Sequence, residues 1–150
     1  MDYYIRMDWA SVPDTLVQKL IDHSEVAQDA WISPEANGHY KQFKLPVELQ
    51  QWFYDNLPIP STYEVMLQQY DGIPRGTKHI DKIRDFSYNY VLLTGGDTRT
   101  SWYDEKGNML DTIQYEPFVW YRHEGSIRHD VSRMSSKRLA VTVFNRHKKI

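Results

Sequence analysis

The sequence contains no cysteine among its 150 residues. That absence excludes disulfides, zinc–thiolate sites, iron–sulfur clusters and thiol nucleophiles. Any metal must therefore be held by histidine and carboxylate side chains. No apolar run approaches the about 18 residues that a membrane-spanning helix needs. The polar, acidic start MDYYIRMDWASVPD also lacks the apolar core of a secretion signal. We therefore expect a soluble, cytoplasmic protein that does not enter a membrane.

The sequence also lacks an excess of basic residues, since 18 Lys+Arg stand against 20 Asp+Glu. Such a balance provides no electrostatic footprint for nucleic acid, so we expect no nucleic-acid partner. Internal repeats, low-complexity tracts and linkers are absent as well. A length of 150 residues is typical of one domain, and we predict a single domain over residues 1–150. The oligomeric state is left open.

The first sixty residues favour two helices. Ser11 and Pro13 are typical of a helix start, and apolar residues then recur at helical spacing, which predicts an amphipathic helix over residues 13–24. A second, short helix is predicted over residues 46–56, with three apolar side chains facing inward. These are Val47, Trp52 and Phe53.

After residue 60 the pattern changes to short strands separated by turns. The predicted strands cover residues 63–67, 86–93, 98–103, 109–115, 118–121, 127–131 and 138–144. Short strands at this spacing are typical of a sandwich, a jelly roll or a small barrel. We therefore predict a mainly β fold in which the N-terminal helices pack on one sheet.

Three side chains that suit a metal occur in two separated stretches. His79 and Asp81 are two residues apart, so in a strand both point to the same face. His129 follows 48 residues after Asp81. Two imidazoles and one carboxylate leave coordination positions open, which is the ligand set of non-haem Fe(II) oxygenases. His123 is the rival distal ligand, although we expect it in a turn.

A cation is predicted on a strand that neighbours these ligands, with a strand-start surface position as its alternative. Arg138 stands nine residues after His129 and opens a predicted strand. Its planar guanidinium can bind a carboxylate through two parallel hydrogen bonds, which lysine cannot do. Arg84 and Asn89 also follow the His79–Asp81 pair, but ordinary turn and strand positions explain both better than a place in a pocket.

The order H-x-D, then several strands, then a distal His and an Arg resembles the Fe(II)/2-oxoglutarate-dependent dioxygenase superfamily. Within it, the chain most resembles the prolyl 4-hydroxylase and aspartyl/asparaginyl hydroxylase-like members. The resemblance covers roughly residues 62–144. It includes Tyr70, nine residues before His79, and the turn at residues 95–98, which is similar to a Gly-Gly-x-Thr turn of prolyl hydroxylases. It implies a double-stranded β-helix (jelly roll) with N-terminal helices.

By that resemblance, His79, Asp81 and His129 would be the catalytic ligands of Fe(II), and the reaction would consume O2 and 2-oxoglutarate. The products would be succinate, CO2 and a hydroxylated C–H bond of a peptidyl (prolyl, aspartyl or asparaginyl) or small-molecule substrate. Because ligation needs neutral imidazoles, activity is expected to fail below about pH 6. The alternative is a non-catalytic, cupin-like protein that binds a metal or another ligand.

The same resemblance assigns the cosubstrate site. Arg138 would pair with the distal carboxylate of 2-oxoglutarate, and Tyr70 would donate a hydrogen bond to it. Many members carry Ser or Thr two residues after the Arg, where this chain has Ala140. Thr142 lies on the same strand face and is predicted to contribute a hydroxyl instead.

Overall fold

The computed structural model describes residues 1–27, 31–32, 40–72 and 78–146. These residues form two helices and ten strands. In chain order the elements are β1 (Tyr4–Arg6), α1 (Asp14–Val26), β2 (Trp31–Ile32), β3 (Tyr40–Lys44), α2 (Val47–Asn56), β4 (Glu64–Asp71), β5 (Phe86–Thr94), β6 (Thr100–Tyr103), β7 (Met109–Ile113), β8 (Trp120–Glu124), β9 (His129–Val131) and β10 (Lys137–Phe144). Neither helix is long and apolar enough to cross a membrane.

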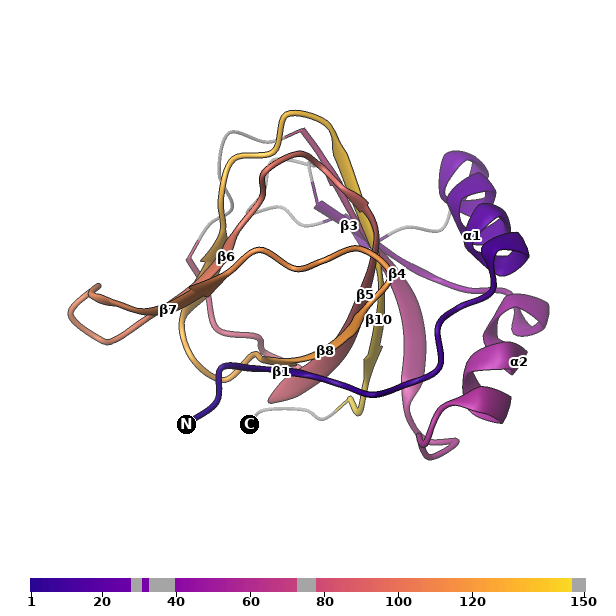
Figure 1. The fold of residues 1–150 in the computed structure, drawn as a ribbon, viewed down its shortest axis with the longest axis horizontal. Helices are drawn as coiled ribbons and strands as arrows, with labels where there is room; N and C mark the ends of the chain where they lie inside the picture. The colour runs from indigo at the N-terminus through magenta and orange to yellow at the C-terminus, as the bar shows by residue number, and fades with distance from the viewer. Residues whose placement is uncertain (28–30, 33–39, 73–77, 147–150) are drawn as a thin grey trace.

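The strands form two sheets that face each other (Figure 1). The larger sheet has the order β1-β8-β5-β10-β4-β3-β2, and the smaller has the order β7-β6-β9. All strand pairs are antiparallel. From β5 onward the chain passes repeatedly from one sheet to the other, which places strands that are distant in sequence side by side. The mainly β, double-stranded β-helix prediction is therefore confirmed.

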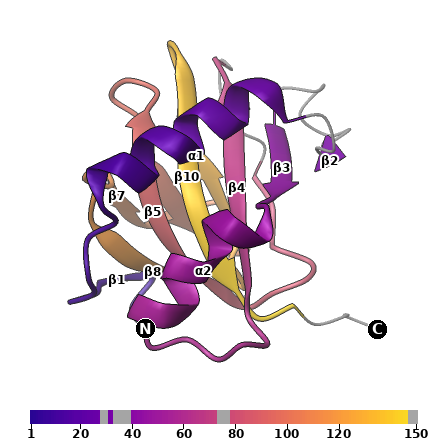
Figure 2. The same ribbon diagram turned by 90° about the vertical axis from the view of Figure 1, so that its right-hand side faces the viewer.

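Both helices cover the outer face of the larger sheet, on the side away from the smaller sheet (Figures 1 and 2). Strand β10 shows how the two sides of this sheet differ. Leu139, Val141 and Val143 are completely buried and belong to the core beneath the helices. Because side chains alternate along a strand, Arg138 and Thr142 point the other way, into the space between the sheets. Packing against the helices therefore stabilises the sheet whose opposite face carries the polar residues Arg138 and Thr142.

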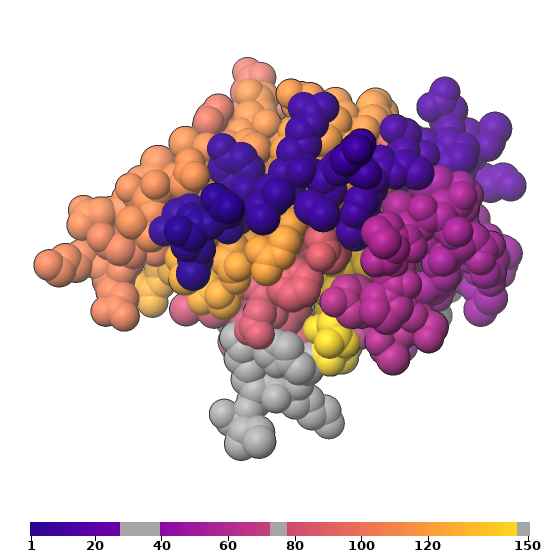
Figure 3. Space-filling model, turned by 60° about the horizontal axis from the view of Figure 1, so that its bottom comes forward, coloured from indigo at the N-terminus to yellow at the C-terminus, as the bar shows by residue number. Residues whose placement is uncertain are grey.

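The N-terminal segment closes one side of the molecule, as Figure 3 shows where it crosses the outside of β8 and reaches α2. Strand β1 pairs with β8, and Trp9 packs on Tyr88 and Trp120 at ring-centroid distances of 4.4 and 5.4 Å. The Val12 backbone N–H donates to the Tyr90 hydroxyl at 3.2 Å. These contacts add aromatic packing and a buried hydrogen bond to the helix-covered core.

The sequence-based prediction missed all three strands among the first sixty residues. β1 and β2 are short and lie at the two edges of the larger sheet. In β3 the residues on the face toward the smaller sheet are Tyr40, Gln42 and Lys44, so the strand lacks a simple apolar alternation. Such strands are stabilised by their neighbours rather than by a pattern of their own.

Three local predictions were wrong. The first helix begins at Asp14 after an extended Pro13, and no side chain caps it, so Ser11 is not its start. Val47 is 74% exposed, because it precedes the buried Phe53 by six residues and a helix of 3.6 residues per turn places them on different faces. His123 lies buried in β8 rather than in a turn.

Candidate metal centre

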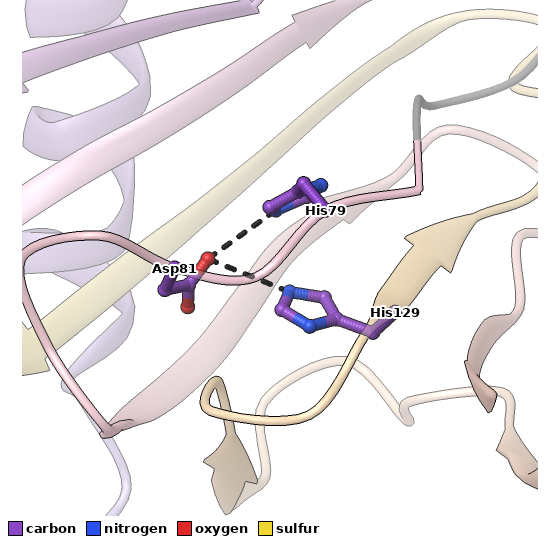
Figure 4. Close-up of side chains that lie close together, drawn as sticks. All are labelled: His79, Asp81 and His129. Carbon is purple, nitrogen blue, oxygen red and sulfur yellow. Dashed lines mark ion pairs between the residues drawn. The ribbon is translucent and has the colours of Figure 1, made fainter. Parts of the chain in front are cut away.

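Backbone hydrogen bonds bring the three predicted metal ligands together. His79 and His129 exchange two backbone N–H···O bonds, each 2.9 Å long, across an isolated bridge. The Asp81 N–H donates to the carbonyl of Gly125 at 2.9 Å. His79 forms only this isolated bridge and not a full strand, yet the bridge suffices to place the side chains of His79 and Asp81 on one side. His129 reaches the same point from β9 (Figure 4).

The ligand atoms converge on one point. Asp81 Oδ1 lies 3.2 Å from His79 Nε2 and 3.5 Å from His129 Nε2. One ligand atom from each residue falls within 4.8 Å of the other two. Bonds of about 2.0–2.2 Å to a single divalent ion require donor atoms roughly 4 Å apart or less, so this donor set fits such an ion with small adjustments. The mixture of two imidazoles and one carboxylate matches non-haem iron.

Asp81 and His129 are prepared for ligation by their surroundings. Burial raises the pKa of Asp81, but hydrogen bonds with His129 and His79 and the charge of Arg84 outweigh burial and hold that pKa well below its ordinary value. The carboxylate is therefore ionised. His129 Nδ1 lies 2.7 Å from the Ile127 carbonyl. With Nδ1–H donating there, loss of the Nε2 proton that bonds Asp81 would leave Nε2 the lone pair that a metal needs.

His123 is not part of the triad. Its Nδ1 lies 3.0 Å from the Tyr115 hydroxyl, and its ring packs edge-on against His129 at 4.7 Å between centroids. Burial lowers the pKa of His123 well below its ordinary value, and the nearby His129 adds to that effect. The neutral ring of His123 therefore packs against His129 and does not bind the metal itself. The residue that groups with His79 and Asp81 is His129.

Arg138 lies in the space between the sheets, beside Tyr70 on β4 and Thr94 on β5 in the strand register. Its side chain is buried, yet no hydrogen bond or ion pair reaches the guanidinium from any described residue. Burial lowers its pKa, and the Tyr70 and Tyr115 hydroxyls oppose that change. Arg138 lines a cavity together with Thr94, Thr98 and Tyr115. A buried cation that lacks a partner of this kind suits an anionic ligand.

Arg84 lies beside the triad, contrary to the expectation that it is an ordinary turn residue. It is only 7% exposed, and its Nε donates to Asp81 Oδ2 at 3.4 Å. Its Nη1 donates to the hydroxyl of Thr142 at 3.4 Å. Thr142 is thus held by Arg84, and its role as a cosubstrate ligand stays a prediction. Asn89 faces Thr142 in the strand register, and its buried Oδ1 finds no hydrogen-bond partner among the described residues.

No protein-family model and no curated protein matches this sequence. Solved structures do match it. A prolyl hydroxylase from Trichoplax adhaerens, in complex with a hypoxia-inducible-factor peptide, is 12% identical, with 95% of this chain and 84% of that chain covered and a TM-score of 0.64. A 2-oxoglutarate–Fe(II) oxygenase family protein from Burkholderia pseudomallei is 11% identical, with 99% of this chain and 89% of that chain covered and a TM-score of 0.62. A collagen prolyl hydroxylase of Paramecium bursaria Chlorella virus-1 is 13% identical, with 99% of this chain and 97% of that chain covered and a TM-score of 0.58.

The chain has the fold of the 2-oxoglutarate oxygenases. At these identities the likeness concerns the fold, so the resemblance drawn from the sequence is confirmed at that level, and the His-Asp-His triad is present within it.

Within this oxygenase fold, sequence reasoning missed three residues beside the site in addition to Arg84. Thr98 ends the Gly-Gly-x-Thr turn, and its buried hydroxyl has no partner among the described residues although it lines the Arg138 cavity. The turn motif was the signal that could have identified it. Tyr115 follows β7 without any motif. Gly125 abuts Asp81 so closely that a Cβ there would lie 2.3 Å from Oδ2.

Proposed function

We propose that the protein is an Fe(II)- and 2-oxoglutarate-dependent dioxygenase that hydroxylates a C–H bond, with release of succinate and CO2. The observation that carries this proposal is the combination of two features in the layer between the two sheets. A triad with open coordination positions, His79, Asp81 and His129, is accompanied by the buried Arg138, which pairs with none of the described residues. A metal-binding protein of another kind has no need for the second feature, because a buried charge destabilises the fold unless a group pairs with it, and none of the described residues does.

The residues of the chain divide the work as follows. Fe(II) with 2-oxoglutarate would supply the activation of O2 that C–H hydroxylation requires. The triad would hold the metal through two neutral nitrogens and one ionised oxygen. Arg138 would bind the distal carboxylate of 2-oxoglutarate with its planar fork, and its burial would strengthen that ion pair by excluding water.

Two hydroxyl groups support this assignment of the cosubstrate. Thr98 brings a hydroxyl without a described partner into the cavity that Arg138 lines, and supplies the group that Ala140 cannot. Tyr70 stands beside Arg138 in the register, and burial raises the pKa of its hydroxyl, which therefore stays protonated as a donor. The substrate that we propose first is a peptidyl prolyl, aspartyl or asparaginyl side chain, in line with the prolyl hydroxylases among the structures of this fold. A small molecule is the second choice.

The test uses the purified protein under anaerobic conditions with Fe(II) and 2-oxoglutarate. We expect a weak visible metal-to-ligand charge-transfer band from the bound pair. Asp81→Ala should abolish the band, and Arg138→Ala should weaken its dependence on 2-oxoglutarate while Fe(II) binding persists. His23→Ala, which removes an imidazole from α1 on the outer face of the sheet, is the matched control and should leave the band unchanged.

Two results would overturn the proposal. Wild-type protein that binds Fe(II) but shows neither the band nor any thermal shift with 2-oxoglutarate would support the cupin-like alternative. A band without any formation of succinate in air, with or without peptides that contain proline, aspartate or asparagine, would exclude turnover of the cosubstrate.

A further inference from the structure

The carboxylate of Asp81 has two oxygen atoms in different surroundings. Oδ1 faces the Nε2 atoms of His79 and His129, at 3.2 and 3.5 Å. Oδ2 faces the other way, toward Arg84 Nε at 3.4 Å and the α-carbon of Gly125. A freely rotating carboxylate could exchange these oxygens or offer both of them to an ion. The arrangement around Oδ2 opposes both movements.

Arg84 is itself held by contacts with a neighbouring strand. Its guanidinium lies over the ring of Phe144 at 4.5 Å and donates to the Thr142 hydroxyl at 3.4 Å. Thr142 and Phe144 lie on the same face of β10, two residues apart, and both are completely buried. Because β10 is the central strand that pairs with both β4 and β5, it is a rigid support. Through these contacts Arg84 fixes the Asp81 side chain, which lies on a loop, relative to β10.

We infer that Arg84 is a positioning residue that fixes Asp81 so that only Oδ1 is directed at the metal, with Thr142 and Phe144 as its supports. The inference rests on the metal centre of the proposed function and deepens it. A carboxylate that binds through one oxygen leaves one more coordination position open than a carboxylate that binds through two. The chain thereby reserves that position for the cosubstrate and O2. Thr142 receives a different role here from the cosubstrate contact predicted by resemblance.

The test measures Co(II) binding by the whole chain, followed by its visible absorption spectrum, with no 2-oxoglutarate present. Partners that orient a metal ligand typically contribute about 10- to 100-fold in metal affinity, and we expect a loss of that size for Arg84→Gln. Its Co(II) spectrum should also change, because the released carboxylate can bind through both oxygens. Arg84→Lys keeps the charge but not the fork, and should recover only part of the affinity.

The chain offers a matched control. Arg122 also stacks on an aromatic ring, Phe86 at 4.3 Å, and pairs with a carboxylate, Glu124 at 3.4 Å, but on the other face of its strand from His123. Arg122→Gln should leave the affinity and the spectrum at their wild-type values. Should Arg84→Gln fail to fold, Thr142→Val provides the second variant, and a smaller loss of affinity with a shifted spectrum is expected from it.

Two results would overturn the inference. The first is an Arg84→Gln protein (or, if that does not fold, a Thr142→Val protein) with the wild-type spectrum, whatever its affinity, since that would mean an unchanged carboxylate. The second is an equal loss of affinity in Arg122→Gln, which would indicate general destabilisation. Because Co(II) alone is the probe, failure of this inference is distinguishable from failure of the proposed function, which depends on the response to 2-oxoglutarate.

Discussion

Replacing Gly125 with alanine tests the position of the metal ligand most directly. A Cβ at this residue would lie 2.3 Å from Asp81 Oδ2, 3.0 Å from its Cγ and 3.2 Å from its Cβ, whereas ordinary contacts begin at 3.4 Å. The carboxylate must therefore move by about 1 Å. The backbone of Asp81 cannot shift freely to make room, because its N–H donates a hydrogen bond to the Gly125 carbonyl at 2.9 Å. The hydrogen bond from Arg84 Nε to Oδ2 resists the same movement.

A displacement of about 1 Å exceeds the roughly 0.5 Å within which a functional constellation must be held. We therefore expect Gly125→Ala to weaken Fe(II) or Co(II) binding by at least about 100-fold, the upper end of what changes next to a metal ligand cause. Overpacking should also cost the metal-free protein about 1–3 kcal/mol of unfolding free energy. Isothermal titration with Co(II) and urea unfolding measure the two effects.

A double-mutant cycle identifies the clash as the cause. In an Asp81→Ala background the carboxylate is gone and only the 3.2 Å contact with the Cβ of residue 81 is left, so Gly125→Ala should destabilise the metal-free protein far less. Gly107→Ala is the control for general destabilisation, because Gly107 has a φ of 86° but a Cβ added there would meet no atom within 4 Å. It should lower stability and leave metal affinity unchanged. Wild-type Co(II) affinity in Gly125→Ala would refute the reasoning.

Three further predictions concern the neighbours of the centre. Burial lowers the pKa of His123, so the unfolded chain takes up a proton below about pH 6.5 that the folded chain does not. The stability of the metal-free protein should therefore decrease as the pH falls below about 6.5. His123→Gln should flatten that slope in urea midpoints, and an unaltered slope would contradict the cause. Thr98→Val removes a buried hydroxyl that has no described partner, so it should raise the stability of the metal-free protein by about 1 kcal/mol. The same change should weaken 2-oxoglutarate binding by the metal-loaded protein. A variant in which stability and 2-oxoglutarate affinity both rise or both fall would contradict this prediction. Tyr115→Phe removes the hydroxyl that bonds His123 and should cost about 1 kcal/mol of stability by thermal unfolding, whereas no loss would show that this hydrogen bond contributes nothing.

The parts of the fold that could be predicted are those whose own side chains specify them. The helix after Pro13 and the apolar alternation of β10 follow from local periodicity, which does not depend on the rest of the chain. β1 and β3 could not be predicted, because their pairing partners, rather than their own composition, stabilise them. The same holds for His123. Its turn-like neighbours in the sequence predicted a loop, but pairing of β8 with β5 places it in the interior.

The sequence by itself determined which kinds of metal-binding side chains the protein has. The absence of cysteine, the H-x-D pair, the distal His129 and the cation nine residues later follow from the order of residues, and they indicated a metal bound by nitrogen and oxygen. Only the tertiary structure decided which atoms meet. Gly125 stands against Asp81, Arg84 against Thr142, and Thr98 beside Arg138, because antiparallel register and sheet-to-sheet crossings bring distant residues into contact. Such contacts depend on the packing of the whole chain, and no local pattern records them.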